Sequence, residues 1–162
     1  MSMAVDYFER VRSAAARLEP CQRELSALEE AEREVTPWTP TGGGGGGSKF
    51  GHSDPTASAA EGRAEGLSRA LDAKRAELDA LEGVIGDCLV VLEGVRRGMG
   101  AREAEAMELY YVDRAGTWSE VAWELGCSLS TVQRMRDKVI SWMDAVGVAT
   151  VKRGIYDDSQ RS

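Results

Sequence analysis

TWSEVAWELGCSLSTVQRMRDKVISWM, residues Thr117 to Met143, is the stretch that decides how this chain folds. Thr117 can cap a helix, and Glu120, three residues later, completes the pattern of a capping box. Gly126 tolerates the positive φ that ends a helix, and Ser128 is a good N-cap for the next one. The stretch therefore predicts two short helices joined by a tight turn, which is helix-turn-helix spacing.

Both predicted helices have an apolar face, and the second also has a polar one. Apolar residues recur every three or four positions: Val121, Ala122 and Leu125 in the first helix, and Val132, Met135, Val139 and Trp142 or Met143 in the second. The polar residues at the start and on the outer face of the second helix form the candidate DNA-binding set: Ser128, Ser130, Thr131, Gln133, Arg134 and Lys138. Hydroxyls, an amide and cations on a helix are the groups that read a DNA major groove. We therefore predict that Leu129–Lys138 is a recognition helix.

Each kind of side chain in this set has a partner on DNA. Gln133 can pair with adenine, and Arg134 can pair with guanine or a phosphate. Ser130 and Thr131 can bond base edges or backbone oxygens near the positive end of the helix. The alternative is a plain helical hairpin whose outer face is only solvated. The turn, both caps and the polar face together favour DNA binding over that alternative.

The chain resembles the region 4 helix-turn-helix of bacterial sigma factors in the order of four segments: MELYY (107–111), TWSEVA (117–122), GCS (126–128) and STV (130–132). More narrowly, it is similar to small phage regulators of the ArpU and RinA type, which carry such a domain at the C-terminus. The resemblance covers residues 104–146 and extends weakly to 53–60. It implies a phage- or prophage-encoded regulator that activates late genes in the bacterial cytoplasm.

Length and charge limit the size of the fold and the way in which the chain can bind DNA. The chain has 162 residues, a hydrophobic fraction of 43% and a net charge of −7, so it can form one compact domain or a small domain with a helical arm. An acidic protein does not coat nucleic acid non-specifically, because Lys and Arg supply that affinity. The recognition helix itself carries Arg134, Arg136 and Lys138 against Asp137. We therefore expect local, salt-sensitive binding to double-stranded DNA by a homodimer or higher oligomer.

No catalytic, metal or cofactor site is predicted. Cys21, Cys88 and Cys127 lie far apart without CxxC spacing, which indicates buried or incidental thiols. His52 is the single histidine, and no paired carboxylates stand out from the helical charge, so an enzyme is not expected. No apolar run is long enough to span a membrane and no signal peptide is recognisable, so we expect a cytoplasmic protein.

The N-terminal half predicts long helices. Residues 1–36 form a helical arm with a stripe at Ala4, Phe8, Val11, Ala15, Leu18 and Leu25. Pro20 predicts either a kink or two helices, with Glu19 as the last residue of the first. Residues 37–53 form a glycine-rich flexible linker, and Gly47-Ser48-Lys49 has the wrong order for a phosphate-binding loop.

A second long helix is predicted over residues 54–98, with Asp54 as its cap and Pro55 in its first turn. Its apolar stripe is interrupted only by Lys74 and comprises Leu67, Leu71, Leu78, Leu81, Ile85, Cys88, Leu92 and Val95. The stripe fits an antiparallel hairpin with the N-terminal helix or a coiled coil between copies, and we expect a hairpin that also dimerises.

The C-terminal part begins at a joint formed by Gly98 and Gly100. A scaffold helix over 101–112 precedes the helix-turn-helix, and the whole DNA-binding domain spans 101–147. For Trp118 and Trp123, core or half-buried packing is favoured over the alternative of platforms on which bases stack. In the tail, 148–162, residues 148–155 are expected to be extended or to contact a dimer partner, and residues 157–162 to be disordered.

The sequence thus predicts an all-α protein, with a long helical hairpin or coiled coil joined to a small helix-turn-helix domain. The favoured function is sequence-specific DNA binding in transcription. Two alternatives remain: a small terminase subunit that recognises phage DNA for packaging, and a helical adaptor that binds RNA polymerase.

Overall fold

The computed structural model describes residues 1–35 and 55–160, with side chains described for 1–35 and 58–154. These residues form helices α1 (Met3–Val35), α2 (Pro55–Gly98), α3 (Ala101–Tyr111), α4 (Trp118–Glu124), α5 (Leu129–Val146) and α6 (Val148–Gln160), and no strand. The all-α prediction is confirmed. The predicted linker and the Asp54 cap lie outside the described residues, whereas the opening of α2 at Pro55 agrees with the prediction.

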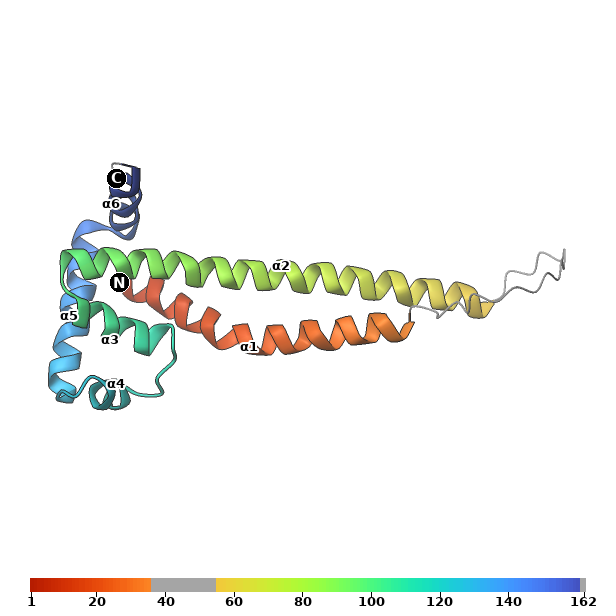
Figure 1. The fold of residues 1–162 in the computed structure, drawn as a ribbon, viewed down its shortest axis with the longest axis horizontal. Coiled ribbons are helices and arrows are strands. Elements are labelled where there is room, and N and C mark those ends of the chain that lie inside the picture. Colours follow the sequence, from red (N-terminus) through yellow and green to blue (C-terminus); the bar gives the residue numbers. More distant parts are fainter. Residues whose placement is uncertain (36–54, 161–162) are drawn as a thin grey trace. The chain divides into compact units, whose positions relative to one another are not determined.

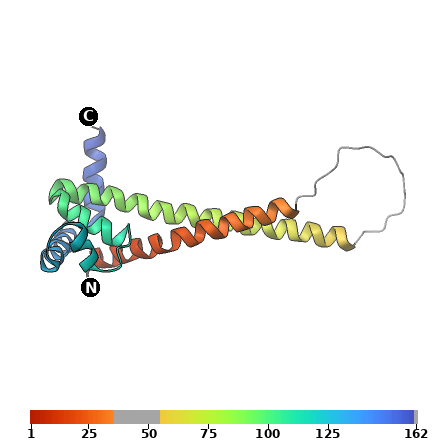
Figure 2. The ribbon, with the colours of Figure 1, turned by 60° about the horizontal axis from the view of Figure 1, so that its bottom comes forward.

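The chain divides into two compact units. Unit 1 comprises Met1–Glu19 and Asp79–Ser162, and unit 2 comprises Pro20–Leu78. Both long helices contribute to both units, and in each unit the segment of α1 runs antiparallel to the segment of α2 (Figures 1 and 2). The boundaries between the units therefore fall inside α1 and α2, whereas the predicted segments end where the long helices end.

Unit 1 has a large apolar core built by five of its helices. Both ribbon views show α3 and α5 beside the first turns of α1 and the last turns of α2 (Figures 1 and 2). The buried members of this core are Ala4, Phe8, Val11, Cys88, Val91, Leu92, Val95, Ala104, Met107, Tyr111, Val139, Met143 and Val151. Phe8 stacks on Tyr111 with ring centroids 5.0 Å apart, which joins α1 to α3. The core thus fastens the start of the chain to its C-terminal helices.

A second, smaller core lies under α4 and the start of α5. Its buried members are Ala106, Val121, Ala122 and Val132, one or two from each of α3, α4 and α5. The sequence pattern predicts three of these four as core positions. Because α3 faces both cores, it is the helix on which α4 and α5 rest.

Unit 2 has fewer buried side chains than unit 1, and ion pairs also join its two helical segments. Cys21 and Leu71 are its buried apolar residues among those described. Lys74, which interrupts the apolar stripe of α2, lies 2.6 Å from Glu24 and 2.8 Å from Glu77. Hydrogen bonds to these two carboxylates raise the pKa of Lys74, and the bond to Glu24 has the larger effect. The cation in the stripe is therefore placed between acids of both helices.

The two-helix alternative at Pro20 and the extended conformation expected after Gly147 are both wrong. α1 runs through Pro20 without ending, so the alternative of two helices is excluded, although proline removes one N–H donor from the helix. The boundary between the units falls at this proline. Residues 148–155 are not extended and residues 157–160 are not disordered, because both belong to α6.

The helical conformation after Gly147 has a local cause. Gly147 adopts a φ of 85°, which ends α5, and its carbonyl accepts hydrogen bonds from the N–H groups of Thr150 and Val151. These bonds begin α6, and Val151 is buried in the core of unit 1. A glycine that stops one helix therefore starts the next in a new direction.

Candidate nucleic-acid interface

The start of α4 has the capping box that the sequence predicts. The Thr117 side chain accepts a hydrogen bond from the Glu120 N–H at 3.2 Å, and the Glu120 carboxylate accepts one from the Thr117 N–H at 3.2 Å. The same carboxylate also accepts from the Gly116 N–H. These bonds satisfy backbone donors that a helix start leaves without partners, so a helix of only seven residues begins at a defined position.

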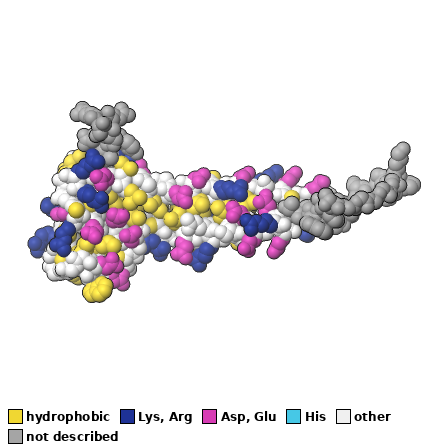
Figure 3. Space-filling model, in the orientation of Figure 1, with side chains coloured by type: hydrophobic (Ala, Val, Ile, Leu, Met, Phe, Trp, Pro, Cys, Tyr) yellow, Lys and Arg dark blue, Asp and Glu magenta, His cyan; other side chains and the backbone are white. Residues whose placement is uncertain are grey.

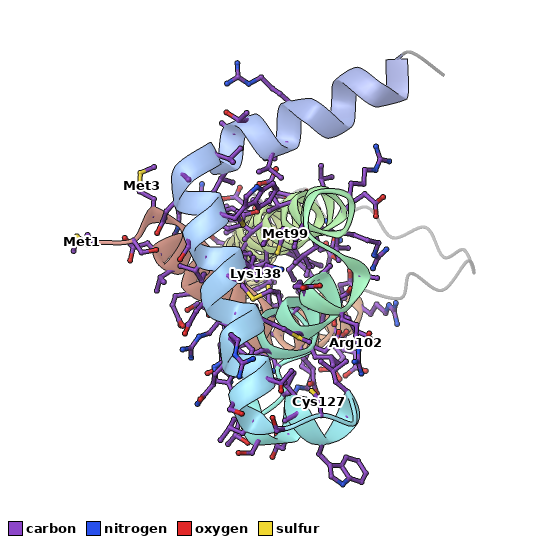
Figure 4. All side chains as sticks on the ribbon, turned by 90° about the vertical axis from the view of Figure 1, so that its left-hand side faces the viewer. Met1, Met3, Met99, Arg102, Cys127 and Lys138 are labelled. Atoms are coloured by element: carbon purple, nitrogen blue, oxygen red, sulfur yellow. The ribbon has the colours of Figure 1, made fainter. Side chains whose placement is uncertain are left out.

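The turn between α4 and α5 is a Schellman motif. The Gly126 N–H donates to the Trp123 carbonyl at 3.1 Å, and the Cys127 N–H donates to the Ala122 carbonyl at 3.0 Å. Gly126 has a φ of 63°, a conformation that residues with a Cβ rarely adopt. In Figure 4 this turn, which carries Cys127, lies at the lower end of α5. The glycine thereby sets the direction in which α5 leaves the turn.

Three hydroxyl groups gather at the start of α5. Ser128 is the N-cap, and its Oγ accepts from the Thr131 N–H at 3.2 Å. The same Oγ lies 3.0 Å from Ser130 Oγ and 2.7 Å from Thr131 Oγ1. Ser128 and Ser130 are exposed, whereas Thr131 is half-buried. The structure thus brings together three of the six predicted site residues, already bonded to one another.

Both cores hold α5 in place. Val132, in its first turn, is buried in the small core, while Val139 and Met143, further along, are buried in the large one. Protein interiors are close-packed and resist displacement of the residues within them. The outer face of α5 is therefore presented by a helix anchored at two places.

Arg12 is a positioning residue that the sequence pattern does not reveal. Its guanidinium lies 3.9 Å from the centroid of the Tyr110 ring. It donates hydrogen bonds to the carbonyl oxygens of Tyr110 and Ala115, at 2.5 and 3.2 Å. Arg12 thus fastens α1 to the end of α3 and to the loop before α4. No local motif marks it, because its partners lie about a hundred residues away in the chain.

The outward side chains of α5 fall into two groups. Gln133 and Arg134 are exposed, and within the described part of the chain neither side chain makes a hydrogen bond or an ion pair. Lys138 is 60% exposed, but its Nζ lies 3.6 Å from a carboxylate oxygen of Glu103 on α3. Of the predicted readout residues, two are therefore free and the lysine is paired.

The electrostatic setting of this face is mixed. Residues 101–147 contain five Lys or Arg and eight Asp or Glu. Arg136 donates two hydrogen bonds to Asp137, at 2.9 and 2.8 Å, and Arg102 donates to the Leu125 carbonyl at 2.8 Å. On the face drawn in Figure 3, side chains of both signs are interspersed over unit 1. Attraction of phosphates by a broad positive field is therefore not available here.

The two tryptophans of α4 differ in burial. Trp118 stacks on Tyr110, with ring centroids 3.9 Å apart, so its prediction as a packing residue is confirmed. Trp123 is 84% exposed, and the same prediction for it is wrong. Each residue turns a helix by about 100°. The buried residues Val121 and Ala122 therefore leave Trp123 on the opposite side of this short helix.

Thiol chemistry, metal binding and membrane spanning are the other properties that the described residues can be checked for. Cys21 and Cys88 are buried, Cys127 is half-buried, and all three are free. Within residues 1–35 and 55–160, no group of His, Cys, Asp and Glu is arranged to hold a metal ion, and no helix is long and apolar enough to cross a membrane. The outer face of α5 is thus the feature with the clearest chemistry.

Fold and site together define an all-α protein in which the short helix α4 and the 18-residue helix α5, each with an N-cap, pack beside two long helices. No protein-family model matches the chain, and neither the curated proteins nor the solved structures show a significant match to it.

Proposed function

We propose that this protein is a sequence-specific transcriptional regulator that binds double-stranded DNA through Leu129–Lys138 of α5. The observation that carries the proposal is the pair Gln133 and Arg134, exposed and unpaired on a helix that two cores hold in place. An amide and a guanidinium can each form two hydrogen bonds with a base edge in the major groove. Such readout needs side chains on a rigid element, which α5 supplies.

The hydroxyl cluster and the caps support the same function. Ser128, Ser130 and Thr131 lie at the start of α5, where the helix dipole favours a phosphate oxygen. The turn between α4 and α5 is short and tightly bonded, as a helix-turn-helix requires. Together with the resemblance of residues 104–146 to phage late regulators, this supports a role in activating phage late genes.

Few free cations imply that one copy binds weakly. Arg134 is the cation of α5 without an ion pair in the described part of the chain. We therefore propose a homodimer or higher oligomer, in which linked copies gain affinity through a high effective concentration. Two-fold symmetry would then appear in the DNA as two half-sites with a fixed spacing.

The test is selection of bound sequences from a pool of random DNA duplexes at moderate salt. The natural protein should enrich one motif, and Gln133→Ala/Arg134→Ala should bind that motif at least about 30-fold more weakly, since two base contacts are lost. Binding to unrelated duplexes should change by only a few-fold, because phosphate contacts are sequence-independent.

The chain contains a matched control for this experiment. Gln22 and Arg23 form the same dipeptide on α1, and both are exposed. Gln22→Ala/Arg23→Ala makes the same change in charge and composition and should leave the selected motif and its affinity unchanged. Failure of the natural protein to enrich any motif would overturn the proposal.

A second candidate function, a helical adaptor that binds a protein, is favoured by one observation. Trp123 is 84% exposed on α4, and exposed tryptophans are enriched among the residues that dominate protein interfaces. The acidic balance of residues 101–147 also fits a basic protein surface better than it fits DNA.

Purified bacterial RNA polymerase is the probe for this candidate. If the adaptor function holds, Trp123→Ala weakens polymerase binding at least about 30-fold, the effect of removing a dominant interface residue. Gln133→Ala/Arg134→Ala then has no effect. Equal polymerase binding by the natural protein and Trp123→Ala contradicts the adaptor function.

A further inference from the structure

Leu129, the first residue of α5, is an exposed apolar side chain on the face proposed to read DNA. It is 40% exposed and belongs to neither apolar core. The other apolar residues of the first two turns behave differently: Val132 is buried and Met135 packs against the small core. Leu129 therefore leaves a larger fraction of its surface in water than either of them does.

Helix geometry places Leu129 beside the candidate readout residues. Each residue turns the helix by about 100°. Viewed along the axis, one sector of about 140° therefore holds four residues, in the order Leu129, Gln133, Ser130 and Arg134. Leu129 and Gln133 are four residues apart, so their side chains are neighbours on the helix surface. The sector thus combines one apolar group with an amide, a hydroxyl and a guanidinium, all of them exposed.

Asp137 also falls within this sector, one turn further along. Its charge is compensated, because Arg136 donates two hydrogen bonds to one of its carboxylate oxygens. The free part of the sector is therefore its first turn and a half, where Leu129 and Gln133 lie.

In the major groove, only thymine presents a methyl group, and adenine presents the acceptor and donor that pair with a Gln amide. An apolar side chain beside a glutamine is thus complementary to an A·T base pair, or to two adjacent ones. A guanine or cytosine at the same place would leave Leu129 against polar edges that it cannot bond.

We infer that Leu129 is a specificity-determining residue that contacts a thymine methyl group next to the adenine paired with Gln133. This inference rests on the proposed DNA-binding function and specifies its target: a site with A·T pairs opposite the start of α5. The contact adds selectivity without charge, in a domain whose cations are mostly paired.

The test removes the methyl group alone. The duplex enriched from the random pool is synthesised with uracil in place of each thymine in turn, and its affinity for the natural protein is measured. At one thymine position the substitution should weaken binding about fourfold, the effect of withdrawing one methyl-sized group from an apolar contact. Leu129→Ala should bind the thymine duplex with a similar loss and should no longer distinguish thymine from uracil.

Val146 provides the matched control, since it is an apolar residue at the other end of α5 and is 37% exposed. Val146→Ala should retain the full discrimination between thymine and uracil. Circular dichroism confirms that each variant keeps its helices, so a lost contact is distinguished from a lost fold.

The possible failures separate the two proposals. If a motif is enriched but no uracil substitution matters, or if Leu129→Ala discriminates as well as the natural protein, the inference about Leu129 is overturned while DNA recognition stands. If no motif is enriched, the DNA-binding function is overturned and the inference with it.

Discussion

The two compact units are built from the same two long helices but differ in how much they bury. Among the described residues, unit 1 contains nineteen of the twenty-one buried apolar side chains, whereas unit 2 contains Cys21 and Leu71. In unit 1, α3, α5 and α6 add buried residues to the core formed with α1 and α2. In unit 2 the pair stands without other described helices, and ion pairs such as Arg75 with Glu29, 3.5 Å apart, join its surfaces.

The difference shows that long helices do not carry stability in proportion to their length. Burial of apolar surface is the dominant favourable contribution, and a pair of helices leaves most of each surface in water. Exposed ion pairs add little to stability. We therefore expect unit 2 to open at a lower free-energy cost than unit 1.

The largest expected effect comes from a cavity in unit 1. Phe8→Ala should lower the free energy of unfolding by about 3–5 kcal/mol, because Phe8 is fully buried and stacks on Tyr111. Leu71→Ala in unit 2 is the comparison, since Leu71 is also buried. Urea denaturation followed by circular dichroism measures the main transition of each variant.

Hydrogen exchange then locates the change. Leu71→Ala should accelerate exchange in residues 20–35 and 58–78 and leave α3 and α5 protected, whereas Phe8→Ala should accelerate exchange throughout unit 1. If both variants lower the main transition equally and expose the same amides, the two units unfold together and the comparison fails.

High pH should weaken unit 1 in particular. Burial raises the pKa of Tyr111 from 10.0 to about 12 and, together with the charge of Asp87, raises the pKa of Cys88 from 9.0 to about 12. For each group, at a pH between its ordinary pKa and its raised pKa, the unfolded chain has released the proton and the folded chain has kept it. Rising pH therefore favours unfolding. Stability should be constant below about pH 9 and should then fall, by at most about 1.4 kcal/mol per pH unit for each group.

Chemical denaturation at pH 8, 9.5 and 11 measures this decline. Tyr111→Phe keeps the ring and removes one ionisable group, so its stability should fall less steeply above pH 10 than that of the natural protein. A decline of equal steepness in both proteins would show that Tyr111 does not contribute.

The smallest expected effects lie in unit 1 but away from its large core. Thr117→Ala and Ser128→Ala should each cost about 1 kcal/mol, the usual contribution of an N-cap. Ser119→Ala is the control, because Ser119 is exposed within α4 and caps nothing. Thermal melting of the three variants measures the differences, and a Ser119 variant as destabilised as the other two would contradict the role of the caps.

Local rules were sufficient for the helix ends of the candidate site. The capping box at Thr117, the positive φ at Gly126 and the cap at Ser128 agree with prediction, because each depends on side chains within a few residues of the backbone they bond. The two-helix alternative at Pro20 was wrong, because α1 continues through the proline. The helix after Gly147 was not predicted, although local hydrogen bonds to the Gly147 carbonyl begin it.

The sequence by itself determined the helices before Gly147, their apolar stripes, and the composition of the outer face of α5. Those properties follow from residue spacing and from short-range hydrogen bonds. Only the tertiary structure decided that Arg12 reaches the loop before α4, that Glu103 pairs with Lys138, and that Trp123 and Leu129 stay exposed. Those outcomes depend on which surfaces distant helices cover, and spacing along one helix carries no information about its neighbours.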